Sequence, residues 1–374
     1  MFSSFNSRWA LAAMAIAPAF SQAPQRLIPK IDLPADSPVT MISADWGDTS
    51  STPRGGAFLV DVRASLSFRN TSRQRIRGVT LAVLSQEVTP GGKGSVSVPS
   101  LDVAPGETFP INVDLHLLRP IGGLGGQAGA PGVEVRLDGV LFDDLNFYGP
   151  DKLHSRRTMT VWELEARRDR TYFKKVLETA GGKGLQDAMI DSLTRQAESD
   201  APHGGVQVVR GRATNSDPER EVSFAFLHFP GAPVEASDGM ARISGSEARA
   251  PRIDVKNHST RAIRYLEIGW IVKDSEGHEF LAASMPADVN LAAGQSQQVG
   301  EDASMKFLHT SIQGMTGFVS SVGFTDGTYW IPDRGALNDP KVGRVMAPSP
   351  EEQRLARLYL KRGLSGLIEE LKKF

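Results

Sequence analysis

One pattern of residues occurs twice in this chain, and that repeat limits the possible folds more than any other feature. Five positions that begin at Asn-x-Ser and continue as alternating apolar residues recur 187 residues later (257 − 70). They are Asn70, Ile76, Val79, Leu81 and Val83 in the first half, and Asn257, Ile263, Leu266, Ile268 and Trp270 in the second. Alternation with a period of two predicts strands whose apolar side chains face a core.

A second shared motif closes each half of the chain. Val140-x-Phe142-x-Asp144 matches Val322-x-Phe324-x-Asp326 at an offset of 182 (322 − 140). Two adjacent aromatic residues and then x-Pro-Asp follow in both halves. So many coincident positions indicate a duplicated domain.

Short alternating segments separated by Gly, Pro and Asn turns predict an antiparallel β-sandwich in each half. Asp274-Ser275-Glu276-Gly277 has the composition of a hairpin turn. In the second half we expect strands over residues 206–209, 222–229, 252–256, 263–273, 279–284 and 317–324.

After each closing motif the apolar period becomes helical. Residues 160–176 and 185–197 predict two helices that are separated by the glycine-rich stretch 181–184. Ser349 and Pro350 are typical of a helix start, as N-cap and first residue. In the helix that follows, we expect an apolar stripe at Leu360, Leu364, Leu367 and Leu371.

The order of these elements resembles a family of bacterial extracytoplasmic modules. Asn-x-Ser, an alternating strand, the Asp274–Gly277 turn, and Leu291-x-x-Gly294 before another strand are similar to immunoglobulin-like modules of the CARDB and FxLYD type. The motif that gives FxLYD its name is not present. The resemblance covers the sandwich part of both halves; it implies an immunoglobulin-like fold used for display or binding, and it assigns no functional residue.

The beginning of the chain has the pattern of a secretory signal peptide. Arg8 precedes the apolar stretch 9–20, and residues 21–23 fit a small-x-small cleavage site. We therefore expect an exported protein, periplasmic or extracellular, with no transmembrane span. The predicted organisation is a signal peptide (1–23), sandwich domain 1 (24–151), a helical linker (152–200), sandwich domain 2 (201–335) and a C-terminal helical segment (336–374).

Composition and motifs argue against several functions. The formal net charge of −1 gives no general attraction to nucleic acid. Cysteine is absent, which excludes disulfides, thiolate metal sites and a lipid-modified N-terminal cysteine. The stretches 91–94 and 181–184 lack the Ser or Thr that follows Lys in a phosphate-binding loop. No catalytic residue, resident metal or cofactor is predicted.

Repeated acidic and aromatic residues near the end of each half are the candidate site residues. The acids could bind calcium or act on a glycosidic bond, but their occurrence in both halves favours a structural role in turns and helix caps. The aromatic pairs could contact a sugar, and packing against the helix is the competing interpretation. The acids are Asp143, Asp144, Asp151, Asp326 and Asp333; the aromatic residues are Phe147, Tyr148, Tyr329 and Trp330.

These observations favour an exported, non-catalytic scaffold or interaction protein of the bacterial envelope. Its expected partner is another envelope or extracellular protein, or a polysaccharide. Two alternatives remain open: an envelope protein that binds or cleaves carbohydrate, and a subunit of an extracellular assembly.

Overall fold

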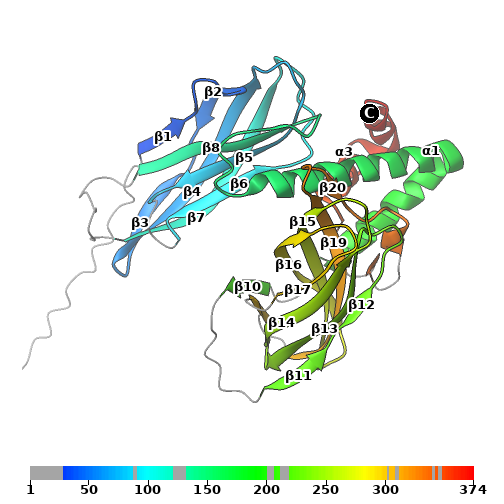
Figure 1. Cartoon of the computed structure of the whole chain (residues 1–374). Helices are drawn as coiled ribbons and strands as arrows, with labels where there is room; N and C mark the ends of the chain where they lie inside the picture. Colours follow the sequence, from blue (N-terminus) through cyan, green and yellow to red (C-terminus); the bar gives the residue numbers. More distant parts are fainter. Residues whose placement is uncertain are drawn as a thin grey trace, which may run out of the picture. The chain divides into compact units, whose positions relative to one another are not determined.

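The computed structural model describes residues 28–86, 91–120, 132–199, 206–210, 219–300, 303–307, 311–338, 342–343 and 348–374 (Figure 1). The segment predicted as a signal peptide lies outside these residues. The chain is mainly β with helical additions, as the sequence predicts: each of two sandwiches is followed by a helical segment.

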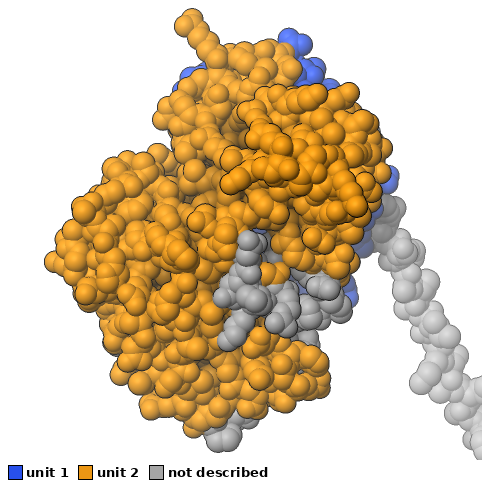
Figure 2. Space-filling view, turned by 90° about the vertical axis from the view of Figure 1, so that its right-hand side faces the viewer, with its two compact units in different colours: residues 1–69, 81–96, 108–137 blue, residues 70–80, 97–107, 138–374 orange. Residues whose placement is uncertain are grey.

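The chain forms two compact units (Figure 2). Unit 1 contains residues 1–69, 81–96 and 108–137, and unit 2 contains residues 70–80, 97–107 and 138–374. Unit 2 thus includes one end of the first sandwich, both long helices and the second sandwich.

The first sandwich has a five-stranded sheet in the order β1-β8-β5-β6, with β9 added to β8, and a four-stranded sheet in which β4 pairs with β2, β3 and β7. The alternate residues Val60, Val62, Leu66 and Phe68 of β4 are fully buried, as are Val79, Leu81 and Val83 of β5 to within 1%. The strands are β1 (Ile28–Asp32), β2 (Val39–Asp45), β3 (Ser50–Arg54), β4 (Ala57–Asn70), β5 (Ile76–Leu84), β6 (Lys93–Val98), β7 (Thr108–Pro120), β8 (Gly132–Phe142) and β9 (Phe147–Tyr148).

The second sandwich has a sheet in the order β12-β19-β15-β16, with β20 added to β19, and a sheet in the order β10-β18-β14-β13-β11, with β17 added to β14. Leu266, Ile268 and Trp270 of β15 belong to the buried core between the sheets. The strands are β10 (Val206–Arg210), β11 (Arg220–Ser223), β12 (Ala225–Leu227), β13 (Val234–Ser244), β14 (Glu247–Asn257), β15 (Ile263–Asp274), β16 (Glu279–Leu291), β17 (Ser296–Val299), β18 (Ala303–Phe307), β19 (Ile312–Phe324) and β20 (Tyr329–Trp330).

The two sandwiches share an order of strands. The sequence β1-β8-β5-β6 in the first corresponds to β12-β19-β15-β16 in the second. In both, the outer strand runs parallel to its neighbour, as β1 does to β8 and β12 to β19. These two pairs differ from the predicted antiparallel pairing.

One predicted strand is wrong. Residues 222–229 form two strands in different sheets, because β11 pairs with β13 whereas β12 pairs with β19. The chain changes sheets at Phe224, whose amide still donates to Gly239 O at 2.8 Å. A mainly apolar segment carries no information on which sheet receives its backbone hydrogen bonds, so the change was not predictable from the pattern.

A buried asparagine holds the same turn in both sandwiches. Asn70 Nδ2 donates to the carbonyls of Gln74 (2.8 Å) and Val103 (3.1 Å). Asn257 Nδ2 likewise donates to the carbonyls of Arg261 (2.8 Å) and Leu291 (3.1 Å). Both side chains are fully buried, so water cannot replace these bonds.

We expect Asn70→Ala and Asn257→Ala each to lower the free energy of unfolding by about 2–3 kcal/mol, because each removes a buried side chain that donates to two backbone carbonyls and accepts from the amide two residues later. Urea denaturation followed by circular dichroism measures the change. Asn290→Ala is the control, since Asn290 is exposed on β16. A loss at only one of the two buried positions would contradict their structural equivalence.

Each sandwich is followed by a helix that is interrupted at a glycine. The long helix α1 (Ser155–Ser199) has non-helical backbone at Gly181 (φ 66°, ψ −166°), and α3 (Pro350–Leu371) has it at Gly363 (φ 68°, ψ −170°). Positive φ favours glycine at both positions. Ser349 caps α3 as predicted, and its side chain accepts a hydrogen bond from the Glu352 amide. No helix among the described residues is long and apolar enough to cross a membrane.

The helices α1 and α3 pack together around a shared apolar cluster. Its fully buried members occupy equivalent positions, each residue of α3 lying 182 places after its counterpart in α1 (355 − 173). The pairs are Phe173 with Leu355, Leu185 with Leu367, and Met189 with Leu371. Leu360, predicted to belong to the apolar stripe, is 67% exposed. The interruption at Gly363 changes the helical phase, so the stripe that ends at Leu371 does not extend back to Leu360.

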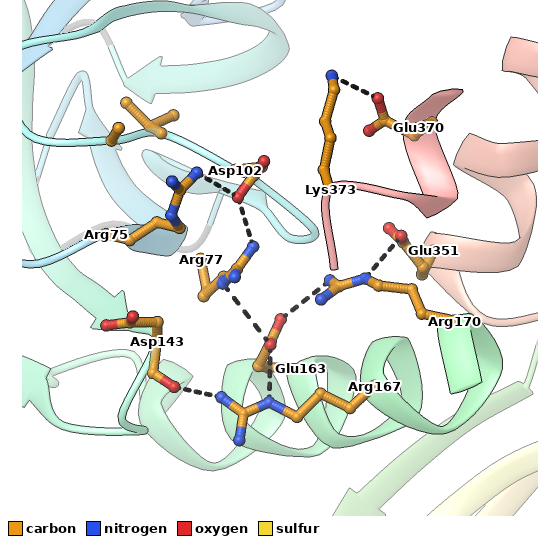
Figure 3. A network of polar contacts seen from close by, with 12 residues as sticks. Arg75, Arg77, Asp102, Asp143, Glu163, Arg167, Arg170, Glu351, Glu370 and Lys373 are labelled. Carbon is orange, nitrogen blue, oxygen red and sulfur yellow. Dashed lines mark hydrogen bonds and ion pairs between the residues drawn. The ribbon is translucent and has the colours of Figure 1, made fainter. Parts of the chain in front are cut away.

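A buried ion network joins the two helices and the adjoining end of the first sandwich (Figure 3). Arg170 of α1 contacts Glu351 of α3 at 2.9 Å and Glu163 of α1 at 3.4 Å. All three side chains are at most 5% exposed. The ring of Phe374 lies 4.1 Å from the Arg170 guanidinium. These contacts compensate the cost of burying the charges.

The network extends onto the first sandwich through Arg77. Its Nε lies 3.8 Å from the Glu163 carboxylate, and its Nη1 donates a hydrogen bond of 2.7 Å to Asp102. Asp102 also accepts a hydrogen bond of 2.7 Å from Arg75. Burial lowers the pKa of Arg77, and the neighbouring Glu163 carboxylate opposes that shift.

Candidate functional site

The acids that the sequence singled out close turns. Asp144 accepts from the Asn146 amide at 2.9 Å, and its counterpart Asp326 accepts from the Thr328 amide at 3.0 Å. The hydrogen bonds from Thr328, first from its amide and then from its hydroxyl, together with the bond from Arg261, lower the pKa of Asp326 to about 2. Both carboxylates are therefore bound to their own loops.

The remaining predicted acids make separate local contacts. Asp151 accepts from the Arg156 amide (2.9 Å) at the start of α1, and Asp333 accepts from the Ala336 amide (2.7 Å). Asp143 is exposed, and its carbonyl accepts from Arg167. Over the part of the chain that the structure describes, no group of three or more acidic or histidine side chains is placed to hold a metal ion.

The predicted aromatic residues have two different environments. Phe147 and Tyr148 form β9 against β8, and a Cβ on Gly139 would lie 2.0 Å from Phe147 Cζ, so this ring packs directly on the glycine backbone. Trp330 packs against the core of the second sandwich. Tyr329 lines a cavity of about 570 Å³, described below.

A different set of residues forms a cavity of about 390 Å³ between the first half of α1 and the sheet that contains β15, β16 and β19. We name it the acidic cavity, and define it by Trp162, Glu165, Glu267, Ser284, Phe318 and Ser321. The position of Phe318 depends on Gly269, where a Cβ would lie 2.4 Å from the Phe318 Cζ atom. The side chains of the cavity come from a helix and from paired strands, which position groups more rigidly than loops do.

Glu267 is held by three hydroxyl groups at the wall of the acidic cavity. It lies on β15 between Leu266 and Ile268, whose side chains point into the sandwich core, so Glu267 points to the opposite face. Tyr265 Oη donates to it at 3.1 Å and Ser321 Oγ at 3.4 Å, and Ser284 Oγ donates to its other oxygen. Desolvation raises the pKa of Tyr265, and the charge of Glu267 is the second largest contribution in the same direction. Tyr265 therefore remains a hydrogen-bond donor.

Glu165 faces the same cavity without a partner. Among the described residues its carboxyl group makes no hydrogen bond and no ion pair. Desolvation raises the pKa of Glu165 from 4.5 to about 7; the charge of Arg168 opposes the shift, and those of Asp169 and Glu267 add to it. Glu165 therefore changes its charge near neutral pH.

The two arginines beside the cavity are engaged elsewhere. Arg168 contacts Asp169 at 2.9 Å and donates to Pro332 O at 3.2 Å. Arg157 lies 3.6 Å from the centre of the Tyr265 ring and 3.7 Å from Asp288. Neither neutralises Glu165 or Glu267 by a direct ion pair among the described residues.

A second cavity, of about 570 Å³, adjoins the first at Arg157. It contains three arginines, Arg156, Arg157 and Arg264, together with the predicted site residues Asp151 and Tyr329. We name it the basic cavity. Of the nine residues that the sequence singled out, these two thus line a common cavity.

Sequence reasoning missed Glu165 and Glu267. Glu267 had a usable signal, because it is the one charged residue between Tyr265 and Val272 in a strand that is otherwise apolar. Glu165 had none, because the strands that desolvate it come about 100 residues later in the chain.

Comparison with known proteins does not place the chain in a family. No protein-family model matches it, and no curated protein matches it. Solved structures give only distant similarity: a β-glucosidase from Kluyveromyces marxianus, in complex with glucose, has a TM-score of 0.15 and 11% identity over 74% of this chain and 46% of its own.

A structure of the CBM32-1, CBM32-2 and M60 catalytic domains of Clostridium perfringens ZmpB has a TM-score of 0.11 and 8% identity, over 89% of this chain and 43% of its own. Allantoicase from Saccharomyces cerevisiae has a TM-score of 0.07 and 9% identity, over 74% of this chain and 82% of its own. This chain thus spans less than half of the first two structures.

Proposed function

We propose that this protein is an exported, non-catalytic interaction protein of the bacterial envelope, formed by duplication of a unit that consists of one immunoglobulin-like sandwich and one interrupted helix. The shared strand order and the two helices interrupted 182 residues apart (363 − 181) support the duplication. The apolar stretch at residues 9–20 supports export.

The acidic cavity is the observation that carries the binding role. It is a preformed concave space with apolar walls and a few placed polar groups, which is typical of binding sites. Its carboxylate Glu267 is fixed by hydroxyl groups, whereas Glu165 has no hydrogen-bond or ion-pair partner in the part of the chain that the structure describes. A partner that inserts a polar group there would satisfy Glu165.

A blocking substitution at the mouth of the cavity tests this function. Thr158 lines the cavity and is exposed on α1, so Thr158→Trp fills the mouth without disturbing the core. We expect envelope components that the wild type retains on an affinity column, and that a buffer wash does not remove, to be reduced at least tenfold with this variant. Thr179→Trp is the matched control, because Thr179 is also exposed on α1 and lies in neither cavity.

Two results would contradict the proposal. Equal retention by both tryptophan variants would show that the acidic cavity is not the binding site. If the heat-denatured protein retained the same components as the native one, no specific interaction function would remain.

Carbohydrate cleavage is the second candidate, and one observation favours it. A carboxyl group with a pKa of about 7 and a second carboxylate held by hydroxyl groups share one cavity, as the acid and its partner do in glycosidases. Hydrolysis of aryl glycosides or of peptidoglycan, followed from pH 4 to 9, tests it. Activity should fall above pH 7 as Glu165 loses its proton, and Glu165→Gln should lower the rate by about 10²–10⁴-fold.

A further inference from the structure

The charges around the acidic cavity define the kind of ligand it can accept. Glu165 and Glu267 are the two carboxylates that line the cavity, and neither has a cationic partner within ion-pair distance among the described residues. Of the charged groups that face Glu165, Arg168 and Asp169 pair with each other on α1, and Arg157 lies over Tyr265. From the strands, β15 adds Glu267, while β16 and β19 contribute only uncharged residues to the cavity.

Glu165 and Glu267 differ in how many hydrogen bonds their carboxyl groups already accept. Glu267 already accepts three hydroxyl donors, so a neutral ligand would gain little from it. Glu165 accepts none and is desolvated, which makes its ionised form costly. A cation would offset that cost by a charge-assisted hydrogen bond, which is about twice as strong as a neutral one.

The walls of the cavity also suit a cation on an apolar stem. Trp162 and Phe318 contribute aromatic surface, and Val161 and Leu281 contribute aliphatic surface. Aromatic faces attract ammonium groups, most strongly at desolvated sites. Arg157 and Arg168 also line the cavity, but they contact Asp288 and Asp169, so an anion would meet two carboxyl groups with no arginine left to pair with it and is disfavoured.

We propose that the acidic cavity binds an ammonium group on an aliphatic stem, such as a lysine-like side chain or an alkylamine, with Glu165 as the group that pairs with the cation. The inference rests on the proposed binding function and names its ligand class. The aliphatic stem occupies the space beside Trp162 and Phe318, and Glu267 contributes a second negative charge whose position its three hydroxyl donors fix.

Calorimetric titration of the full chain with n-pentylammonium chloride tests the proposal, with 1-pentanol as the neutral analogue. Because Glu165 must be ionised to pair with the cation, we expect the affinity for pentylammonium to rise at least tenfold from pH 5.5 to pH 8. Pentanol should bind at least tenfold more weakly than pentylammonium at pH 8. Glu165→Gln should remove both the pH dependence and the preference for the amine.

Glu178→Gln is the matched control, since Glu178 is exposed on α1 and lines neither cavity; it should bind as the wild type does. Equal binding of pentanol and pentylammonium, absence of pentylammonium binding at pH 8, or tighter binding of N-acetylglucosamine would each overturn the inference. If Thr158→Trp still abolishes retention of the envelope partner in that case, the proposed function stands and only the ligand class is wrong.

Discussion

Glu351→Ala is expected to lower the free energy of unfolding by about 3–5 kcal/mol, because it removes one partner from a buried ion pair. Glu351 is fully buried and contacts Arg170 at 2.9 Å and Arg354 at 2.8 Å. Although desolvation opposes ionisation, the hydrogen bonds and charges of Arg354 and Arg170 lower the pKa of Glu351 below 4.5. The Glu351→Ala variant retains a buried Arg170 that lacks this carboxylate partner.

Urea denaturation at pH 7, followed by tryptophan fluorescence and circular dichroism, measures the loss. Glu178→Ala on exposed helix surface is the control and should change stability by less than about 0.5 kcal/mol. Since the pKa of Glu351 is lowered by folding, its stabilising contribution is present above pH 4.5 and is lost as the pH falls through the lower native pKa. A loss at pH 7 no larger than that of the control would contradict the role of the network.

Glu165→Gln is expected to stabilise the protein above pH 7, by up to about 3 kcal/mol. Folding raises the pKa of Glu165 from 4.5 to about 7, so the native state binds the proton more tightly than the unfolded state does. The wild type therefore loses stability as the pH rises from 4.5 to 7, and the loss is complete above pH 7. Glutamine has no charge to desolvate and avoids this penalty.

The measurement is the free energy of unfolding of both proteins at pH 4.5, 6, 7 and 8.5. The difference should be near zero at pH 4.5, grow through pH 6 and reach its limit by pH 8.5. A difference that does not vary with pH would show that Glu165 is not desolvated in the folded protein. Saturating pentylammonium should reduce the difference at pH 8.5, because it stabilises only the protein that retains the carboxylate.

The core strands were predictable because their alternation survives in the fold. Leu266, Ile268 and Trp270 of β15 are buried with no exposed fraction, as period-two spacing requires. β13 was not predicted, because register shifts after Ala236 and Met240 break its alternation. A bulge adds a residue without any fixed sequence signal, so a simple period count fails there.

The candidate site was less predictable than the fold. The turn role favoured for Asp144 and Asp326 agrees with their hydrogen bonds, since both depend on residues two places away in the chain. The acidic cavity forms where α1 packs against strands that are distant in the sequence, and no local sequence pattern predicts that packing. The side chains that share the cavity with Trp162 come from β15, β16 and β19, which lie about 100 or more residues later in the chain.

The pairing of α1 with α3 has a consequence for how the chain folds. Arg170 and Glu351 are 181 residues apart, so the contacts between these helices close a very long loop. During synthesis the apolar face of α1, with Phe173, Leu185 and Met189, emerges long before its partner does. Until α3 arrives, this face is open to chaperones, proteases and other nascent copies, and docking of α3 is expected to be a late folding step.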